Sequence, residues 1–198
     1  MWTMISNSCF GYKCFQTVYN AEYNTPFVAC YFSIKEMFKL MKDYKKIFPN
    51  AELVFLDDKD YPTTHFTTSD VYIEWYHHNS RESVLDDFKR RSDRMTNKLL
   101  FLCYLGEGHE IGYQNYITKE YRQNIIQQFI DSEYPSIVVT YNKDDLDMKC
   151  DEKKTKILYL EHPDYDYDDK PDKIPHSMQI PAAHLAGEYL NSDECTLV

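Results

Sequence analysis

The chain has 198 residues, of which 43% are hydrophobic and 16% aromatic, enough for one domain with a substantial core. Its formal net charge of −10 repels a phosphate backbone, which disfavours nucleic-acid binding. We expect neither a membrane span nor a signal peptide, because the sequence contains no apolar run of 18 residues and no signal-like start. Six cysteines without a CxxC pair predict reduced thiols and a cytoplasmic location.

The first part of the chain alternates strand-like and helix-like segments. Residues 33–48 give the clearest helix, because apolar side chains recur at spacings of three and four while lysines take the other side. Ser33 and Glu36 form a capping box at its start. In chain order we predict a strand at 3–6, a helix from 10 or 11 to 19, a strand at 27–32, this helix, a strand at 53–56 and a polar loop at 57–69.

The rest of the chain continues the alternation. Residues 71–76 alternate apolar and polar side chains, and residues 99–105 are apolar throughout, as in a central strand covered on both faces. We expect an α/β fold in a single domain over residues 1–198, with a mainly parallel sheet of about five to six strands and helices on both faces. The further elements are helices at 80–95, 118–131 and 182–191, strands at 136–141 and 156–160, and an exposed acidic loop at 164–173.

Two polar clusters follow predicted strands and lead into predicted helices. The first is Ser6-Asn7-Ser8-Cys9 after the opening strand, and the second is His77-His78-Asn79-Ser80 after the strand at 71–76. If both strands are parallel members of one sheet, their carboxyl ends share an edge at which loops and helix N-termini converge on ligands. We therefore expect the two clusters to border a common cavity.

His77 is the first candidate for a general base. Moving an acetyl group from a thioester to an amine needs a base, because only the neutral amine attacks, and a positioned imidazole can serve near neutral pH. The alternative is a packed histidine in the strand-to-helix turn, and both interpretations also apply to His78, the second candidate. Cys9 could act as a nucleophile at a helix N-terminus, although a small buried thiol is the commoner role of a lone cysteine.

The helix predicted at 80–95 carries the densest positive patch of this acidic chain. A polyphosphate ligand such as CoA or a nucleotide sugar would need such a patch, whereas the alternative is a solvated helix face paired with aspartates. Arg91 differs from its neighbours because it lies at the margin of the apolar stripe, where a guanidinium needs a buried carboxylate or a bound anion. The basic residues are Arg81, Lys89, Arg90, Arg91, Arg94 and Lys98.

The sequence gives no sign of a metal site. No His/Cys spacing fits zinc, and the aspartates between 164 and 172 lack the full calcium-loop pattern, so no metal is expected. Asp57-Asp58 is the nearest approach to the aspartate pair that a metal-dependent glycosyltransferase would place at a strand end. The glycine-rich dinucleotide and phosphate loops and the GxSxG nucleophile motif are also absent.

Several short stretches, in order and with matching spacing, resemble the capsule and exopolysaccharide-biosynthesis acyltransferase family. In that family a strand closes in an aromatic residue, one further residue and His-Tyr; His77 takes the histidine position, and His78 replaces the tyrosine. The family also has a tryptophan-and-arginine helix, in which Phe88 here replaces the tryptophan. The matching stretches are 5–11, 24–28, Tyr61-Pro62, 73–78, Phe88 with Arg90, Arg91 and Arg94, and 189–191.

The resemblance implies an acetyl-CoA-dependent N-acetyltransferase. Related domains in giant DNA viruses are associated with acetylating nucleotide-linked 4-amino sugars of the 4-amino-4,6-dideoxyhexose type, for virion glycans. On this reading acetyl-CoA is the co-substrate, the protein acts in the cytoplasm (of the host, if viral), and another sugar-modifying domain is fused or associated. The implied site consists of His77 as base with His78 beside it, Asn7, Ser8, Cys9 and Tyr61 at the acceptor, and Arg91 and Arg94 at phosphates.

Two other classes of function stay open on the sequence. The first is a noncatalytic module that binds a glycan or a nucleotide sugar and belongs to a larger biosynthetic enzyme. The second is a glycosyltransferase or another enzyme of phosphate-linked sugars, which would respond to a nucleotide sugar alone. The response to acetyl-CoA separates the acetyltransferase from both, because a ligand stabilises only a protein that binds it.

Overall fold

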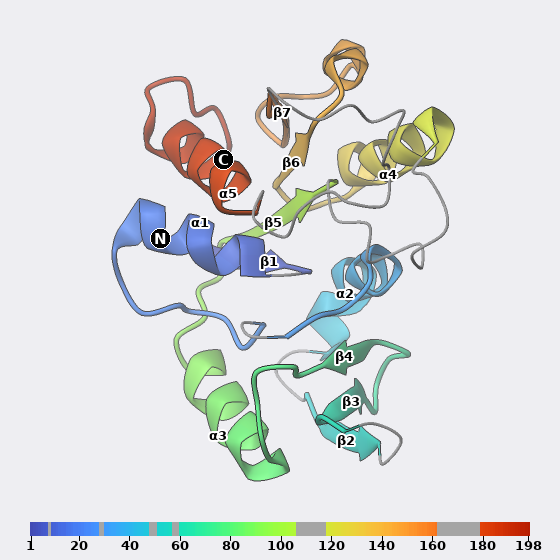
Figure 1. Cartoon of the computed structure of the whole chain (residues 1–198), viewed down its shortest axis with the longest axis vertical. Coiled ribbons are helices and arrows are strands. Elements are labelled where there is room, and N and C mark those ends of the chain that lie inside the picture. Colours follow the sequence, from blue (N-terminus) through green and yellow to red (C-terminus); the bar gives the residue numbers. More distant parts are fainter. Residues whose placement is uncertain (8, 28–29, 48–50, 57–59, 106–117, 162–178) are drawn as a thin grey trace.

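The computed structural model describes residues 1–7, 9–27, 30–47, 51–56, 60–105, 118–161 and 179–198 (Figure 1). Within them a parallel sheet runs in the order β1-β5-β6-β7. Strands β5 and β6 are buried along their whole length, as the apolar run at 99–105 indicates for a strand covered on both faces. The four strands are β1 (Thr3–Ser6), β5 (Leu99–Tyr104), β6 (Ser136–Thr140) and β7 (Thr155–Tyr159).

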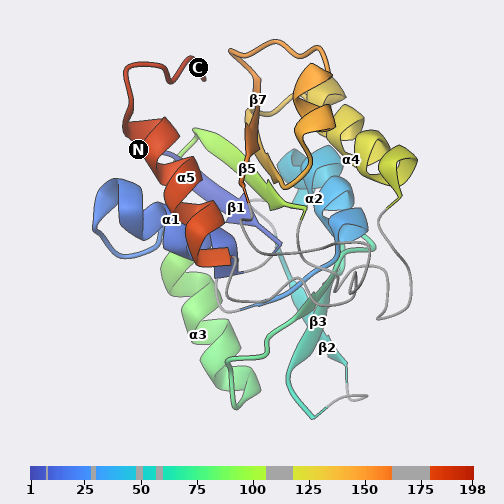
Figure 2. The same ribbon diagram turned by 45° about the horizontal axis from the view of Figure 1, so that its top comes forward.

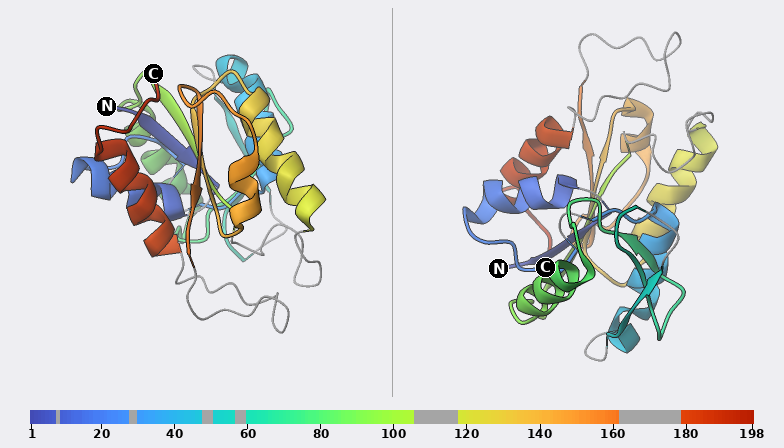
Figure 3. Two further views of the ribbon diagram at one scale, coloured as in Figure 1. Left: turned by 90° about the horizontal axis from the view of Figure 1, so that it is seen from above. Right: turned by 60° about the horizontal axis from the view of Figure 1, so that its bottom comes forward.

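Helices cover both faces of the parallel sheet (Figure 3, left). One face carries α1 (Cys9–Tyr19) and α5 (Gln179–Asn191), and the other carries α2 (Ile34–Ile47) and α4 (Lys119–Asp131). Because successive side chains of a strand point to opposite faces, Met4 belongs to the core with α1 and α5, whereas Ile5 belongs to the core with α2 and α4. The α/β class and the helices on both faces are therefore confirmed.

The prediction of five to six mainly parallel strands is wrong, because three strands form a separate antiparallel sheet. Strand β3 falls within residues 57–69, which the sequence predicts as a loop because most of these side chains are polar. Its threonines are β-branched and suit a strand, and the indole Nε1 of Trp75 donates a hydrogen bond to Thr64 Oγ1 at 2.9 Å. The strands are β2 (Leu53–Leu56), β3 (Thr63–Phe66) and β4 (Tyr72–Glu74), in that order.

The predicted strand at 27–32 is not found as a strand in the part of this segment that the structure describes. Tyr31 forms an isolated bridge with Glu74, and Phe27 and Phe32 are almost fully buried. The apolar character of this segment therefore reflects its place in the core, which periodicity alone cannot separate from strand formation. Residues 28 and 29 lie outside the described residues.

Helix α3 (Arg81–Ser92) lies next to the antiparallel sheet, below the parallel sheet in Figure 2. Ser80 caps it, because the Ser83 backbone N–H donates to Ser80 Oγ at 3.2 Å. Its buried stripe includes Phe88, whose ring packs edge-on against Trp75 with centroids 6.4 Å apart. Phe88 thus anchors this side of α3 in the core that contains Trp75.

The other predicted helices and strands occur close to their expected bounds. Thr118 caps α4 through the Tyr121 N–H, and a short 3-10 helix, η2 (Lys143–Asp147), joins β6 to β7. The predicted acidic loop at 164–173 lies outside the described residues. Among the helices that the structure does describe, none has the length and apolar character needed to cross a membrane.

Candidate functional site

A pocket of about 650 Å³ lies between α1, with the loop that follows it, and the second half of α3. It is built from segments that are far apart in the sequence, and both sides contribute charged side chains to its lining. Among the described residues that line it are four cationic side chains and one carboxylate. The charged lining consists of Lys13, Glu22, Arg90, Arg91 and Arg94, and His77 joins them from the turn before α3.

The three arginines reach the pocket because of their place on α3. The helix buries Val84 and Phe88, and the three arginines lie in and just after its last turn, with Arg91 at the margin of this buried stripe. Positive charge at a helix C-terminus is also favoured by the helix dipole. Three guanidinium groups therefore gather in an otherwise acidic chain, at a helix end where positive charge stabilises the helix.

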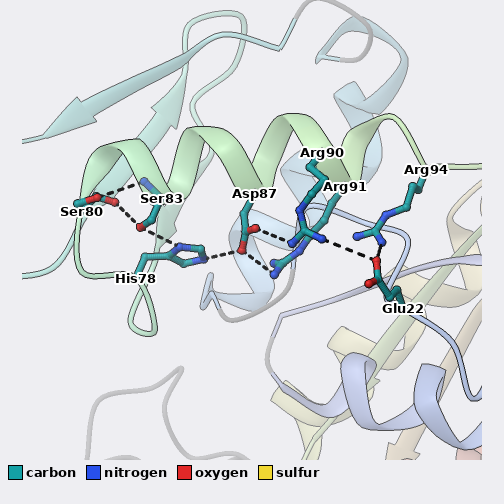
Figure 4. A network of polar contacts seen from close by, with 8 residues as sticks. All are labelled: Glu22, His78, Ser80, Ser83, Asp87, Arg90, Arg91 and Arg94. Atoms are coloured by element: carbon teal, nitrogen blue, oxygen red, sulfur yellow. Dashed lines mark hydrogen bonds and ion pairs between the residues drawn. The ribbon is translucent and has the colours of Figure 1, made fainter.

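Two carboxylates neutralise part of this charge (Figure 4). Asp87 contacts Arg91 at 2.6 Å and Arg90 at 2.7 Å, within the same helix. Glu22, from the loop after α1, lies 3.7 Å from Arg90 and also pairs with Arg94. Burial lowers the pKa of Arg91, and Asp87 opposes that shift. Asp87 is thus the carboxylate partner that the position of Arg91 on the helix requires. The residues that line the pocket still carry more positive than negative charge.

His77 and His78 occupy different environments. His77 is exposed and lines the pocket, whereas His78 is buried and packs edge-on against Trp75. His78 Nδ1 lies 3.3 Å from Ser83 Oγ, and its Nε2 lies 3.9 Å from Asp87 Oδ2. Burial lowers the pKa of His78, Asp87 raises it, and Arg91 lowers it further. His77 therefore borders the pocket, whereas His78 belongs to the packed side of the turn.

A family model described as "Domain of unknown function (DUF1919)" matches residues 1–151, about three quarters of the chain. The chain belongs to this family. The match includes β1 through β6 and all the residues that line the pocket, so the pocket is built within the DUF1919 domain. The family description names no activity, and no curated protein matches the chain.

Other residues that the sequence suggested lie elsewhere in the DUF1919 domain. Asn7 is buried, and its carbonyl accepts a hydrogen bond from the Phe32 N–H at 3.4 Å. Tyr61 packs against Tyr76 with ring centroids 4.4 Å apart. Neither Asn7 nor Tyr61 lines the pocket. Ser8 and the side chain of Cys9 lie outside what the structure describes, as does the Asp57-Asp58 pair.

Strand β4 belongs to the antiparallel sheet of the DUF1919 domain, so the histidine turn that follows it does not lie at the edge of the parallel sheet as the sequence predicted. The histidine turn and the Asn-Ser cluster would share a sheet edge only if the strands before them were parallel members of one sheet, but β4 pairs antiparallel with β3 in the other sheet. The turn instead contributes His77 to the pocket beside α1. Sequence reasoning missed Lys13 and Glu22, because no local pattern links α1 and its loop to α3.

Proposed function

We propose that this DUF1919 protein is an acetyltransferase that transfers the acetyl group of acetyl-CoA to the amine of a nucleotide-linked amino sugar. The sugar is of the 4-amino-4,6-dideoxyhexose type, and the product serves surface or virion glycan synthesis. One observation carries the proposal: the pocket places the exposed His77 imidazole beside Arg90, Arg91 and Arg94. Both reactants carry phosphates, which guanidinium groups bind through paired hydrogen bonds.

In the proposed reaction the neutral amine attacks the carbonyl carbon of the thioester. A C–N bond forms, the C–S bond breaks, and His77 accepts the proton that the attacking nitrogen loses. The leaving thiolate then takes a proton from the imidazolium, so that the base is regenerated. A positioned general base contributes about 10²–10⁴-fold to such a rate. Binding of the phosphates by the arginines would hold the reacting atoms within reach of the imidazole.

The sugar ring has a suitable surface next to His77. Tyr76 directly precedes it, is 49% exposed, and packs against Tyr61; the Tyr76 hydroxyl also donates to Glu74. Aromatic rings offer an apolar face to the sugar, and the hydroxyl and carboxylate offer hydrogen bonds. We propose that Tyr61 contributes to acceptor binding from this surface. A role for Asn7 would require its buried amide to become accessible.

Incubation of the protein with acetyl-CoA and a panel of UDP- and dTDP-amino sugars, read by mass spectrometry for a gained acetyl group, tests the proposal. His77→Ala should lower the transfer rate by about 10²–10⁴-fold. Its melting temperature should change little because the side chain is exposed. His184→Ala, at an exposed position on α5, is the matched control and should keep its activity. Normal activity of the His77 variant would remove this residue from the mechanism.

A thermal-shift measurement separates the acetyltransferase from the two other classes. Acetyl-CoA should raise the melting temperature of an acetyltransferase, because a ligand that binds only the folded state stabilises it, and increasingly so as its concentration exceeds its dissociation constant. A noncatalytic nucleotide-sugar module or a glycosyltransferase would respond to the nucleotide sugar and ignore acetyl-CoA. Stabilisation by nucleotide sugar alone, with no acetylated product, would therefore overturn the proposal.

A further inference from the structure

The two carboxylates of the arginine cluster are held very differently. The Asp87 side chain is 25% exposed and is surrounded by Arg90, Arg91 and His78. The Glu22 side chain is 76% exposed and arrives from a different part of the chain, where it contacts Arg90 and Arg94 (Figure 4). Exposed ion pairs are weak because water and salt screen them. Asp87 is therefore a fixed part of the cluster, whereas Glu22 can leave it.

Glu22 occupies the position in which an anionic ligand would meet the arginines. Its carboxylate lies in the mouth of the pocket and contacts two guanidinium groups at once. Among the described residues, moreover, nothing accepts a hydrogen bond from the buried Nε–H of Arg94. A carboxylate from the protein thus satisfies the hydrogen-bonding capacity of these arginines only in part, because the Nε–H of Arg94 has no acceptor among the described residues.

We propose that Glu22 is a displaceable counter-ion that makes the pocket select diphosphates over carboxylates. The inference rests on the proposed binding of phosphates in this pocket and adds the residue that sets its selectivity. A carboxylate ligand replaces Glu22 with a group of the same kind, so it gains little from the exchange. A diphosphate brings more charge and more acceptor oxygens, including one for Arg94 Nε–H, and so compensates for the loss of Glu22.

Isothermal titration calorimetry with pyrophosphate and malonate, at fixed pH and low salt, tests this selectivity. Wild-type protein should bind pyrophosphate and scarcely bind malonate. Glu22→Gln should bind both more tightly, with the larger gain for malonate, so that the ratio of the two affinities falls about threefold, as expected for one exposed ion pair. Asp86→Asn removes the same charge from an exposed position on α3 outside the pocket, and should leave the ratio unchanged.

The outcomes separate the inference from the proposed function. If wild-type protein binds pyrophosphate and Glu22→Gln keeps the wild-type ratio, the role of Glu22 is wrong while the phosphate pocket stands. If Asp86→Asn alters the ratio as much as Glu22→Gln, net charge explains the effect and the inference is also wrong. If neither protein binds pyrophosphate, the phosphate pocket fails and the inference with it. Unchanged melting temperatures would establish that all variants fold.

Discussion

Arginine pairs with carboxylate in two regions of the protein, and the two regions differ in burial and in charge balance. At the end of β6, Arg122 of α4 meets Asp145 of η2 with 2.6 Å between Nε and Oδ2, and their side chains are 4% and 0% exposed. Thr140 Oγ1 donates to the same carboxylate oxygen at 2.5 Å. On α3, by contrast, the arginines outnumber their carboxylates and border an open pocket.

The difference teaches how the balance of charge reveals the role of an arginine. A buried pair of one cation and one anion is neutral, and it ties α4 to the junction between β6 and η2. An open cluster with surplus cations keeps charge available for a ligand, which an isolated neutral pair does not. Arg122 thus makes a structural contact, whereas Arg94, the same type of residue, belongs to a candidate binding site.

The largest effect is expected from breaking the buried pair. Asp145→Ala leaves the Arg122 guanidinium buried without a counter-charge, which should lower the free energy of unfolding by about 3–5 kcal/mol. Urea denaturation followed by circular dichroism measures this change. The double variant Arg122→Met, Asp145→Leu should recover most of the loss, because it removes both charges. A loss below about 1 kcal/mol in the single variant would show that the pair is not structural.

A smaller effect, on binding and not on stability, is expected from the open cluster. Arg94→Gln removes a guanidinium that is partly exposed and paired with Glu22, so the free energy of unfolding should change by less than about 0.5 kcal/mol. The dissociation constant for pyrophosphate should rise on the order of tenfold, and its dependence on salt should weaken. Titration calorimetry at two salt concentrations measures both. Strong destabilisation with unchanged binding would erase the distinction between the two regions.

The smallest effect is expected at His78, which is buried like Arg122 but linked to the pocket through Asp87. Burial lowers the pKa of His78 below its ordinary value of 6.5, so the unfolded chain binds this proton more tightly than the folded protein. The resulting loss of stability is absent well above the unfolded pKa and grows as pH falls through it. Comparing urea denaturation at about pH 7 and about pH 5.5, His78→Gln should lose less stability than wild-type protein.

The corresponding control is His184→Gln, at an exposed position on α5. It should show the same loss of stability between the two pH values as wild-type protein, because its exposed side chain lies on α5, outside the packing around His78. An unchanged pH dependence in His78→Gln would instead mean that the buried imidazole titrates normally.

Much of the secondary structure follows from local sequence signals. Ser33 caps α2 as predicted, and the apolar run at 99–105 forms a central strand. These succeed because capping and burial on both faces leave local patterns. Strand β3 escaped prediction because its polar residues resemble a loop, although Phe66 and both threonines are buried by the surrounding structure. The membership of each strand in the parallel or the antiparallel sheet depends on pairing between distant segments, which local sequence patterns do not show.

The sequence by itself determined the α/β class, the helices, and the choice of a histidine turn and a basic helix as the places to look for chemistry. The tertiary structure alone decided that His77 faces the pocket and His78 the core, since a tight turn sends adjacent side chains in different directions. It also brought Glu22 to Arg94 across 72 positions of the chain. Such a contact depends on how the loop after α1 packs against α3, and no periodicity in the sequence encodes that packing.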